Sequence, residues 1–110
     1  MGKIADATFK GKFSTYAFEV YTTDTVFNSV GAVYILSRRT VGSDGIGKHA
    51  FLYIGQTHSL KDRIPSHEKW HCARNYGVNC ICVHRDNDAN SRLHKELDLL
   101  SVNKTPCNTQ

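Results

Sequence analysis

One carboxylate near the C-terminal end of the chain lies where an acidic side chain is costly. Residues 86–101 have helical periodicity, and at about 100° per residue their apolar side chains form one stripe. The stripe consists of Ala89, Leu93, Leu97, Leu99 and Leu100. Glu96 falls inside it, and a carboxylate that points at a core is unstable unless an ion pair or a metal ion compensates it. The pattern predicts a salt bridge to a buried Arg or Lys, a stripe edge that stays in contact with water, or a metal-binding, catalytic Glu96.

A second set of metal-ligating residue types lies between positions 67 and 84. Its members are His67, His71, Cys72, Cys80, Cys82 and His84. Structural zinc sites usually contain cysteine pairs separated by about two to four residues, whereas one residue separates Cys80 from Cys82. Small thiols buried in a strand explain this pair better, and a zinc-stabilised interaction module is kept as an alternative.

Short strands and helices are expected to position these side chains. Residues 31–36 are apolar on both faces, which is typical of a central strand, and residues 50–55 predict a second apolar strand. The polar, glycine-containing segment 38–49 predicts a mobile loop that joins them as an antiparallel pair. A helix is expected from Ser59, interrupted at Pro65 because an interior proline loses a hydrogen bond.

The two ends of the chain add further elements. Residues 78–84 predict a third strand, and the helix that carries Glu96 follows it. Residues 1–30 contain apolar and aromatic side chains in alternation, so we expect an N-terminal extension of extra strands and one main domain over residues 31–110.

Two tyrosine-centred motifs lie in the first two apolar strands. The first is Ala32-Val33-Tyr34 and the second is Tyr53-Ile54-Gly55. Arg63 follows Tyr53 by ten residues, and His67 follows Arg63 by four. Each motif alone is common, so any significance depends on the order of the whole series.

The C-terminal part of the chain continues the series with Glu96-Leu97-Asp98-Leu99-Leu100 and then Pro106-Cys107-Asn108. In this order and spacing, the motifs resemble those of the GIY-YIG nuclease family. The family pattern consists of Gly-Ile-Tyr, Tyr-Ile-Gly, an arginine, a histidine, Glu-x-x-Leu-Ile and Pro-x-Asn, and the first motif is a loosened form here. The resemblance covers residues 31–108.

The resemblance implies an α+β fold with a small three-stranded antiparallel sheet flanked by helices. It also implies an endonuclease that hydrolyses DNA phosphodiester bonds with one Mg²⁺ or Mn²⁺ ion held by Glu96. Arg63 would bind the scissile phosphate. Tyr34 or Tyr53 would activate the water, and His67 could take the proton, because a tyrosine with a pKa of about 10 needs assistance.

Three further residues are expected to contact substrate or to support the site. Asn108 would anchor the C-terminal segment and orient the site through its amide. Gln56 stands where many members of the family carry a lysine, so its phosphate contact is expected to be weaker unless Lys48 or Lys61 substitutes.

The composition agrees with a DNA-binding protein without requiring one. The 110 residues carry 14 Lys and Arg against 10 Asp and Glu, and the net charge of +4 favours an anionic partner. No apolar run reaches the ~20 residues of a membrane span. The N-terminus lacks the apolar core of a signal peptide, which predicts a cytoplasmic protein whose four cysteines are reduced thiols.

A catalytically inactive relative that only binds nucleic acid is the main alternative to an active nuclease. No recognition helix or zinc finger is evident in the sequence. We therefore expect a homodimer or a separate specificity subunit to select the DNA that is cut.

Overall fold

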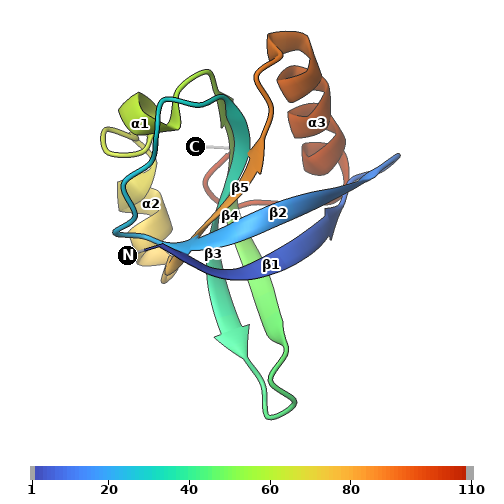
Figure 1. The fold of residues 1–110 in the computed structure, drawn as a ribbon. Coiled ribbons are helices and arrows are strands. Elements are labelled where there is room, and N and C mark those ends of the chain that lie inside the picture. The colour runs from blue at the N-terminus through green and yellow to red at the C-terminus, as the bar shows by residue number, and fades with distance from the viewer. Residues whose placement is uncertain (1, 109–110) are drawn as a thin grey trace.

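Strand pairing dominates the architecture of this chain. The computed structural model describes residues 2–108, and within them five strands form one antiparallel sheet in the order β1-β2-β5-β3-β4 (Figure 1). The strands are β1 (Lys3–Lys10), β2 (Thr15–Thr22), β3 (Ala32–Val41), β4 (Gly47–Thr57) and β5 (Cys80–Arg85). The helices are α1 (Leu60–Arg63), α2 (Trp70–Asn75) and α3 (Ala89–Val102).

The predicted three-stranded sheet flanked by helices is wrong. β3, β4 and β5 occupy the regions in which strands were expected, but β2 pairs with the outer side of β5, and β1 pairs with β2. The sheet curls into a half-barrel, so that the ring of Phe9 on β1 lies 4.7 Å from the ring of Phe51 on β4. The reason is burial: Phe18 and Val20 of β2 are almost fully buried, so this hairpin completes the core.

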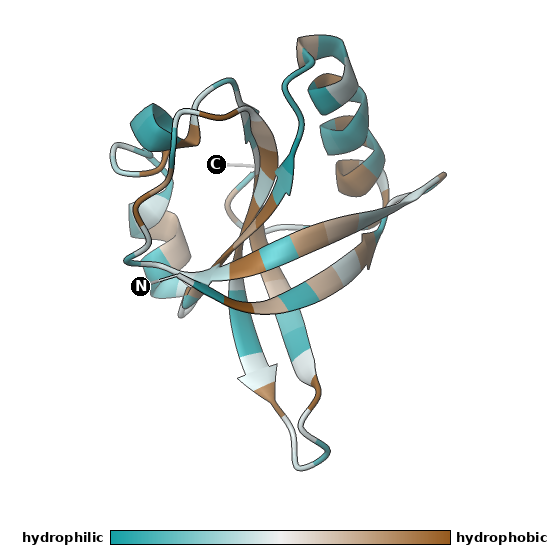
Figure 2. Cartoon of the chain, in the orientation of Figure 1, coloured by the Kyte–Doolittle hydropathy of each residue, from teal (hydrophilic) through white to brown (hydrophobic). Residues whose placement is uncertain are grey.

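The sheet separates two apolar clusters (Figure 2). Tyr34 and Leu36 of β3 face the cluster on the side of α1 and α2, which contribute Leu60 and Ala73. The alternate residues of β3 face the opposite cluster, to which α3 contributes Leu99. The period-two alternation of a strand therefore directs neighbouring side chains to opposite layers.

The mobile loop expected over residues 38–49 is also wrong. β3 and β4 remain paired through most of this segment, as far as Val41 opposite Gly47. The connecting turn is closed by a hydrogen bond from the Gly42 N–H to the Ile46 carbonyl (3.3 Å). Gly45 supplies the left-handed conformation, with a φ of 78°.

The helices depart from their expected limits in two ways. α1 ends at Arg63, shortly before Pro65, and α2 is a separate helix. The apolar stripe predicted for α3 is wrong at Ala89, which is exposed, and at Leu93 and Leu97, which are 44% and 54% exposed. The buried face of α3 instead carries Arg92 and Leu99, and Glu96 lies half-buried between them.

No helix in the described part of the chain is long and apolar enough to cross a membrane.

The cysteines correct another expectation. Cys72 on α2 and Cys107 form a disulfide that links segments 35 residues apart, so two of the four cysteines are not free thiols. Cys80 and Cys82 of β5 are free and buried. The disulfide ties the C-terminal segment to α2.

Reduction of this disulfide is expected to lower the free energy of unfolding by about 4 kcal/mol, because the open chain regains the entropy of a loop of this length. Denaturant titrations of the wild-type protein with and without dithiothreitol measure the change. A Cys72→Ala/Cys107→Ala variant is the control and should not respond to the reductant. Equal midpoints for oxidised and reduced wild-type protein would contradict this assignment.

Candidate active site

Three aromatic rings from three segments meet on the α1 and α2 side of the sheet. Tyr34 of β3 is buried, and its hydroxyl oxygen lies 2.6 Å from Nε2 of His67, which belongs to the segment between α1 and α2. Tyr53 of β4 is half-buried, and its ring lies 4.8 Å from the ring of His67 and 6.1 Å from that of Tyr34. A β-bulge at Leu52 leaves Tyr53 packed against this cluster.

Gly55 gives the two tyrosines the space that they occupy. A β-carbon at this position would lie 2.7 Å from Cε2 of Tyr53 and 2.8 Å from the hydroxyl oxygen of Tyr34. Both distances are shorter than a normal contact. The glycine of the Tyr53-Ile54-Gly55 motif is therefore required by the placement of both tyrosines.

A Gly55→Ala variant is expected to lose about 1–3 kcal/mol of stability, because the added methyl group must displace a tyrosine ring. Urea unfolding measures the loss, and near-ultraviolet circular dichroism reports the displacement of the tyrosines. Gly42→Ala is the matched control, since the nearest atom to its added β-carbon is a side-chain oxygen of Asp44 at 3.2 Å. Equal stability of the two variants would show that the rings do not depend on Gly55.

The hydrogen bonds of His67 define which of its nitrogens carries the proton. Nδ1 accepts the backbone N–H of Lys69 at 3.0 Å, and only an unprotonated ring nitrogen can accept. Burial and the charge of Arg63 lower the pKa of His67 to about 4, so the ring is neutral at pH 7. Nε2 therefore carries the proton and donates to the hydroxyl oxygen of Tyr34. This arrangement favours stabilisation of a tyrosinate by His67 over the expected uptake of a tyrosine proton.

The two tyrosines are protonated in this environment. Burial raises the pKa of Tyr34 and of Tyr53 above the ordinary value, while the positive charge of Arg63 opposes the rise in both. Either tyrosine therefore needs an additional cation before it can act as a base near pH 7.

Arg63, at the end of α1, already has a carboxylate partner. Its Nη1 lies 2.7 Å from Oε1 of Glu68, and this contact holds the pKa of Glu68 at about 2. Both side chains are partly exposed, so the ion pair contributes little stability and can exchange. Sequence analysis missed Glu68. A phosphate that binds Arg63 must compete with it.

Glu96 lies half-buried on the inner face of α3 and forms no hydrogen bond or ion pair with another of residues 2–108. Burial raises its pKa. Burial and the charge of Arg63 influence the pKa of Tyr53 more than the charge of Glu96, which raises it. An uncompensated carboxylate of this kind fits a hard cation.

A cation at Glu96 would have few protein ligands. No group of three His, Cys, Asp or Glu side chains in the described part of the chain is arranged to hold a metal ion. Mg²⁺ and Mn²⁺ would therefore keep several waters or take oxygen ligands from a substrate.

Gln56 and Lys61, two of the expected substrate ligands, form no contact with the three rings among the interactions of residues 2–108. Gln56 is held by α3, because its Oε1 accepts a hydrogen bond from Nε of Arg92 at 3.0 Å. Arg92 is 5% exposed and also donates to the carbonyl of Asp86. Lys61 is exposed on α1. Arg92 was missed by sequence analysis, although it precedes Glu96 by one helical turn.

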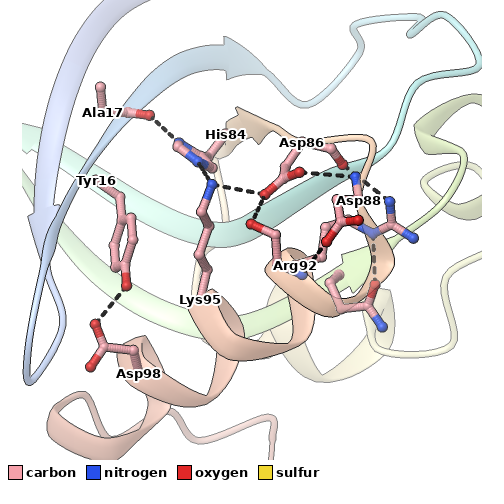
Figure 3. A network of polar contacts seen from close by, with 10 residues as sticks. Tyr16, Ala17, His84, Asp86, Asp88, Arg92, Lys95 and Asp98 are labelled. Carbon is pink, nitrogen blue, oxygen red and sulfur yellow. Dashed lines mark hydrogen bonds and ion pairs between the residues drawn. The ribbon is translucent and has the colours of Figure 1, made fainter.

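A polar network fixes the orientation of α3 and hence of Glu96 (Figure 3). Nζ of Lys95 donates to Oδ2 of Asp86 at 2.8 Å and to Nε2 of His84 at 2.9 Å. Nδ1 of His84 in turn donates to the carbonyl of Ala17 on β2 at 2.8 Å. The contacts join α3 to β5 and β2, so β2, which lies outside the expected three-stranded sheet, helps to position the candidate metal ligand.

Asn108 anchors the other border of the site. Its Oδ1 accepts the Ile54 N–H and its Nδ2 donates to the Ile54 carbonyl, both at 2.8 Å. The amide thus occupies the place of a neighbouring strand along the edge of β4. The Asn108 side chain therefore holds the backbone next to Tyr53, and its amide is directed at that backbone.

The cysteines give no support to the zinc alternative. Cys72 is in the disulfide, and Sγ of Cys82 lies 3.6 Å from Oγ of Ser37 and 3.8 Å from Nδ1 of His49. Burial raises the pKa of Cys82 to about 12, so its thiol keeps its proton at pH 7.

In comparisons with known proteins, no family model, curated protein or solved structure matches this chain. The resemblance to GIY-YIG nucleases therefore stays a prediction based on the series of residues from Tyr34 to Asn108.

Proposed function

We propose that this chain is a metal-dependent endonuclease that hydrolyses DNA phosphodiester bonds with a chemistry like that of GIY-YIG nucleases. One arrangement supports the proposal: Tyr34, Tyr53 and His67 meet beside Arg63, and the half-buried Glu96, whose charge raises the pKa of Tyr53, has no ion-pair partner in residues 2–108. Such a set provides a hydroxyl group for the attacking water, a cation for the phosphate and a carboxylate for a metal ion.

Tyr53 is the better candidate to orient the attacking water. It is half-buried, whereas Tyr34 is only 1% exposed. Tyr34 and His67 would then support the site through the hydrogen bond from Nε2 of His67. This division of roles keeps Tyr34 as a positioning residue.

The charge on the phosphate would be neutralised from two sides. Glu96 would hold Mg²⁺ or Mn²⁺, which would supply Lewis-acid stabilisation of the phosphate oxygens. Arg63 would bind the phosphate by exchanging the carboxylate of Glu68 for it, because a guanidinium binds either group with the same planar geometry.

A nucleic-acid-binding module without catalytic activity is the second candidate. It is favoured by the ion pair between Arg63 and Glu68, which occupies the guanidinium on which cleavage would depend. In either case we propose DNA as the partner. Because one site cuts one strand, we also propose a second copy or a partner subunit for double-strand cleavage.

We keep the cytoplasm as the proposed location. The disulfide between Cys72 and Cys107 weighs against it, since cytosolic proteins rarely maintain structural disulfides.

Replacement of Glu96 by Gln is expected to reduce nicking of supercoiled plasmid by roughly 100-fold or more, because the cation loses its charged ligand. Wild type should nick with Mg²⁺ or Mn²⁺ and not with EDTA. Asp62→Asn is the matched control, an exposed carboxylate on α1 that should leave activity unchanged. Calorimetric titration with Mn²⁺ gives a second readout, in which only Glu96→Gln should weaken binding.

Two results would contradict the proposal. Cleavage that persists in Glu96→Gln would exclude this glutamate as the essential ligand. DNA binding by the wild-type protein without cleavage of supercoiled, branched or single-stranded DNA would favour the binding module.

A further inference from the structure

The distal halves of β3 and β4 leave the sheet as a two-stranded ribbon, defined here as residues 38–50. β5 pairs with β3 only as far as Ser37 opposite Cys80. Beyond that point, β3 and β4 continue to pair with each other from Arg38 opposite Ala50 to Val41 opposite Gly47. Figure 1 shows the tip of this ribbon projecting beyond the rest of the sheet, while nearer its base the ring of His49 lies 5.1 Å from the ring of Phe9 on β1.

The base of the ribbon is held in place by a side chain. Oδ1 of Asn79 accepts the Arg39 N–H at 2.7 Å, and Nδ2 of Asn79 donates to the Arg39 carbonyl at 2.9 Å. The side-chain amide of Asn79 thus provides the hydrogen bonds that a longer β5 would provide. It stabilises a two-stranded structure that would be only marginally stable alone. The far end is fixed by Asp44, whose Oδ1 accepts the Ile46 N–H at 3.0 Å. The ribbon is therefore preorganised.

The ribbon is positively charged. Arg38, Arg39 and Lys48 outnumber Asp44, its single carboxylate. None of the three cations forms an ion pair with another of residues 2–108. The side chains of Arg38 and Lys48 are exposed, and that of Arg39 lies across Gly47. These unpaired cations fit an anionic polymer better than an apolar surface.

Two apolar side chains flank the turn of this polar ribbon. Val41 is 52% exposed and Ile46 is 60% exposed, and Figure 2 shows hydrophobic positions near the tip of an otherwise polar ribbon. A groove of DNA offers two kinds of contact: phosphates along its walls and thymine methyl groups on its floor. A preorganised ribbon with cations along its length and an apolar tip can make both.

We infer that the ribbon of residues 38–50 inserts into a groove of duplex DNA. The choice of duplex DNA as the partner rests on the proposed function. A two-stranded ribbon fits the B-DNA major groove, which is about 12 Å wide. Arg38 and Lys48 neutralise phosphates on the groove walls, and Val41 and Ile46 contact base edges. The ribbon thus supplies the duplex contact for which no recognition helix was found.

An Arg38→Gln/Lys48→Gln variant tests the inference by fluorescence anisotropy with a short labelled duplex in EDTA, over a series of KCl concentrations. EDTA removes the divalent cation, so that DNA binding is measured without cleavage. We expect the affinity to fall by about 10-fold, and the slope of log K against log salt to decrease in magnitude by about 2, because two phosphate contacts are lost. Thermal unfolding of the variant confirms that it is folded.

The matched control is Lys12→Gln/Lys104→Gln. It removes the same net charge from two exposed positions outside the ribbon, and Lys12 lies at the β1–β2 turn, where its N–H donates to the Asp98 carbonyl. It should keep most of the affinity and the salt slope of the wild-type protein. An equal loss in both variants would overturn the inference, because the effect would then reflect net charge alone.

Three other results are decisive. Unchanged duplex binding by the ribbon variant, or no duplex binding by the wild-type protein, overturns the inference. An equal loss for the duplex and for one of its single strands overturns groove insertion. Ribbon-dependent duplex binding by a protein that cleaves no DNA supports the inference while the nuclease proposal fails.

Discussion

The candidate site depends on one buried polar pair, the hydrogen bond between Tyr34 and His67. Both side chains are almost fully buried beside an apolar cluster, where a hydroxyl or imidazole group without a partner would cost about 1–3 kcal/mol. Each satisfies the other, and the Lys69 N–H satisfies the second nitrogen of His67. The pair therefore fixes the segment between α1 and α2 against β3. It also places Arg63 and the ring of Tyr53 around the same point.

Side-chain amides perform a second structural task at the borders of the sheet. Asn79 pairs with the backbone of Arg39 just before β5 begins, and Asn108 pairs with the backbone of Ile54 along the outer edge of β4. In both places, an amide provides the donor and acceptor that a neighbouring strand would provide. One asparagine stabilises the projecting ribbon and the other stabilises the strand that carries Tyr53. The proposed DNA contact and the proposed site of cleavage thus use the same device on the same two strands.

Local periodicity in the sequence predicted the strands of the central part of this fold, but it could not predict how strands far apart in the sequence pair. The apolar segment at 31–36 lies in β3 and is buried on both faces, whereas the segment at 50–55 lies in the edge strand β4, where Ala50 is exposed and Tyr53 is half-buried. Nothing in the local sequence could show that β2 adds to β5, which lies about 60 residues away, or that Cys72 and Cys107 join across 35 residues. The ribbon was missed because its glycines and polar residues are typical of loops.

The site was predictable in part for a similar reason. The sequence placed Glu96 on an inner helical face, and α3 has it half-buried there, although Leu93 and Leu97 are exposed. The sequence could not show that Arg63 pairs with Glu68, or that Arg92 holds Gln56, because both contacts depend on the packing of separate elements. The proton position on His67 likewise depends on the backbone of Lys69.

The most direct test of this account is a long-range ¹H–¹⁵N NMR titration of His67. We expect a neutral ring with its proton on Nε2, which resists protonation down to a pH near its pKa of about 4, because burial and Arg63 oppose the charge. A lowered histidine pKa also means that the unfolded state binds more protons, so the free energy of unfolding should fall as the pH drops below about 6.5. A ring protonated on Nδ1 alone, or one that titrates near pH 6.5, would contradict the central role assigned to the buried pair of Tyr34 and His67.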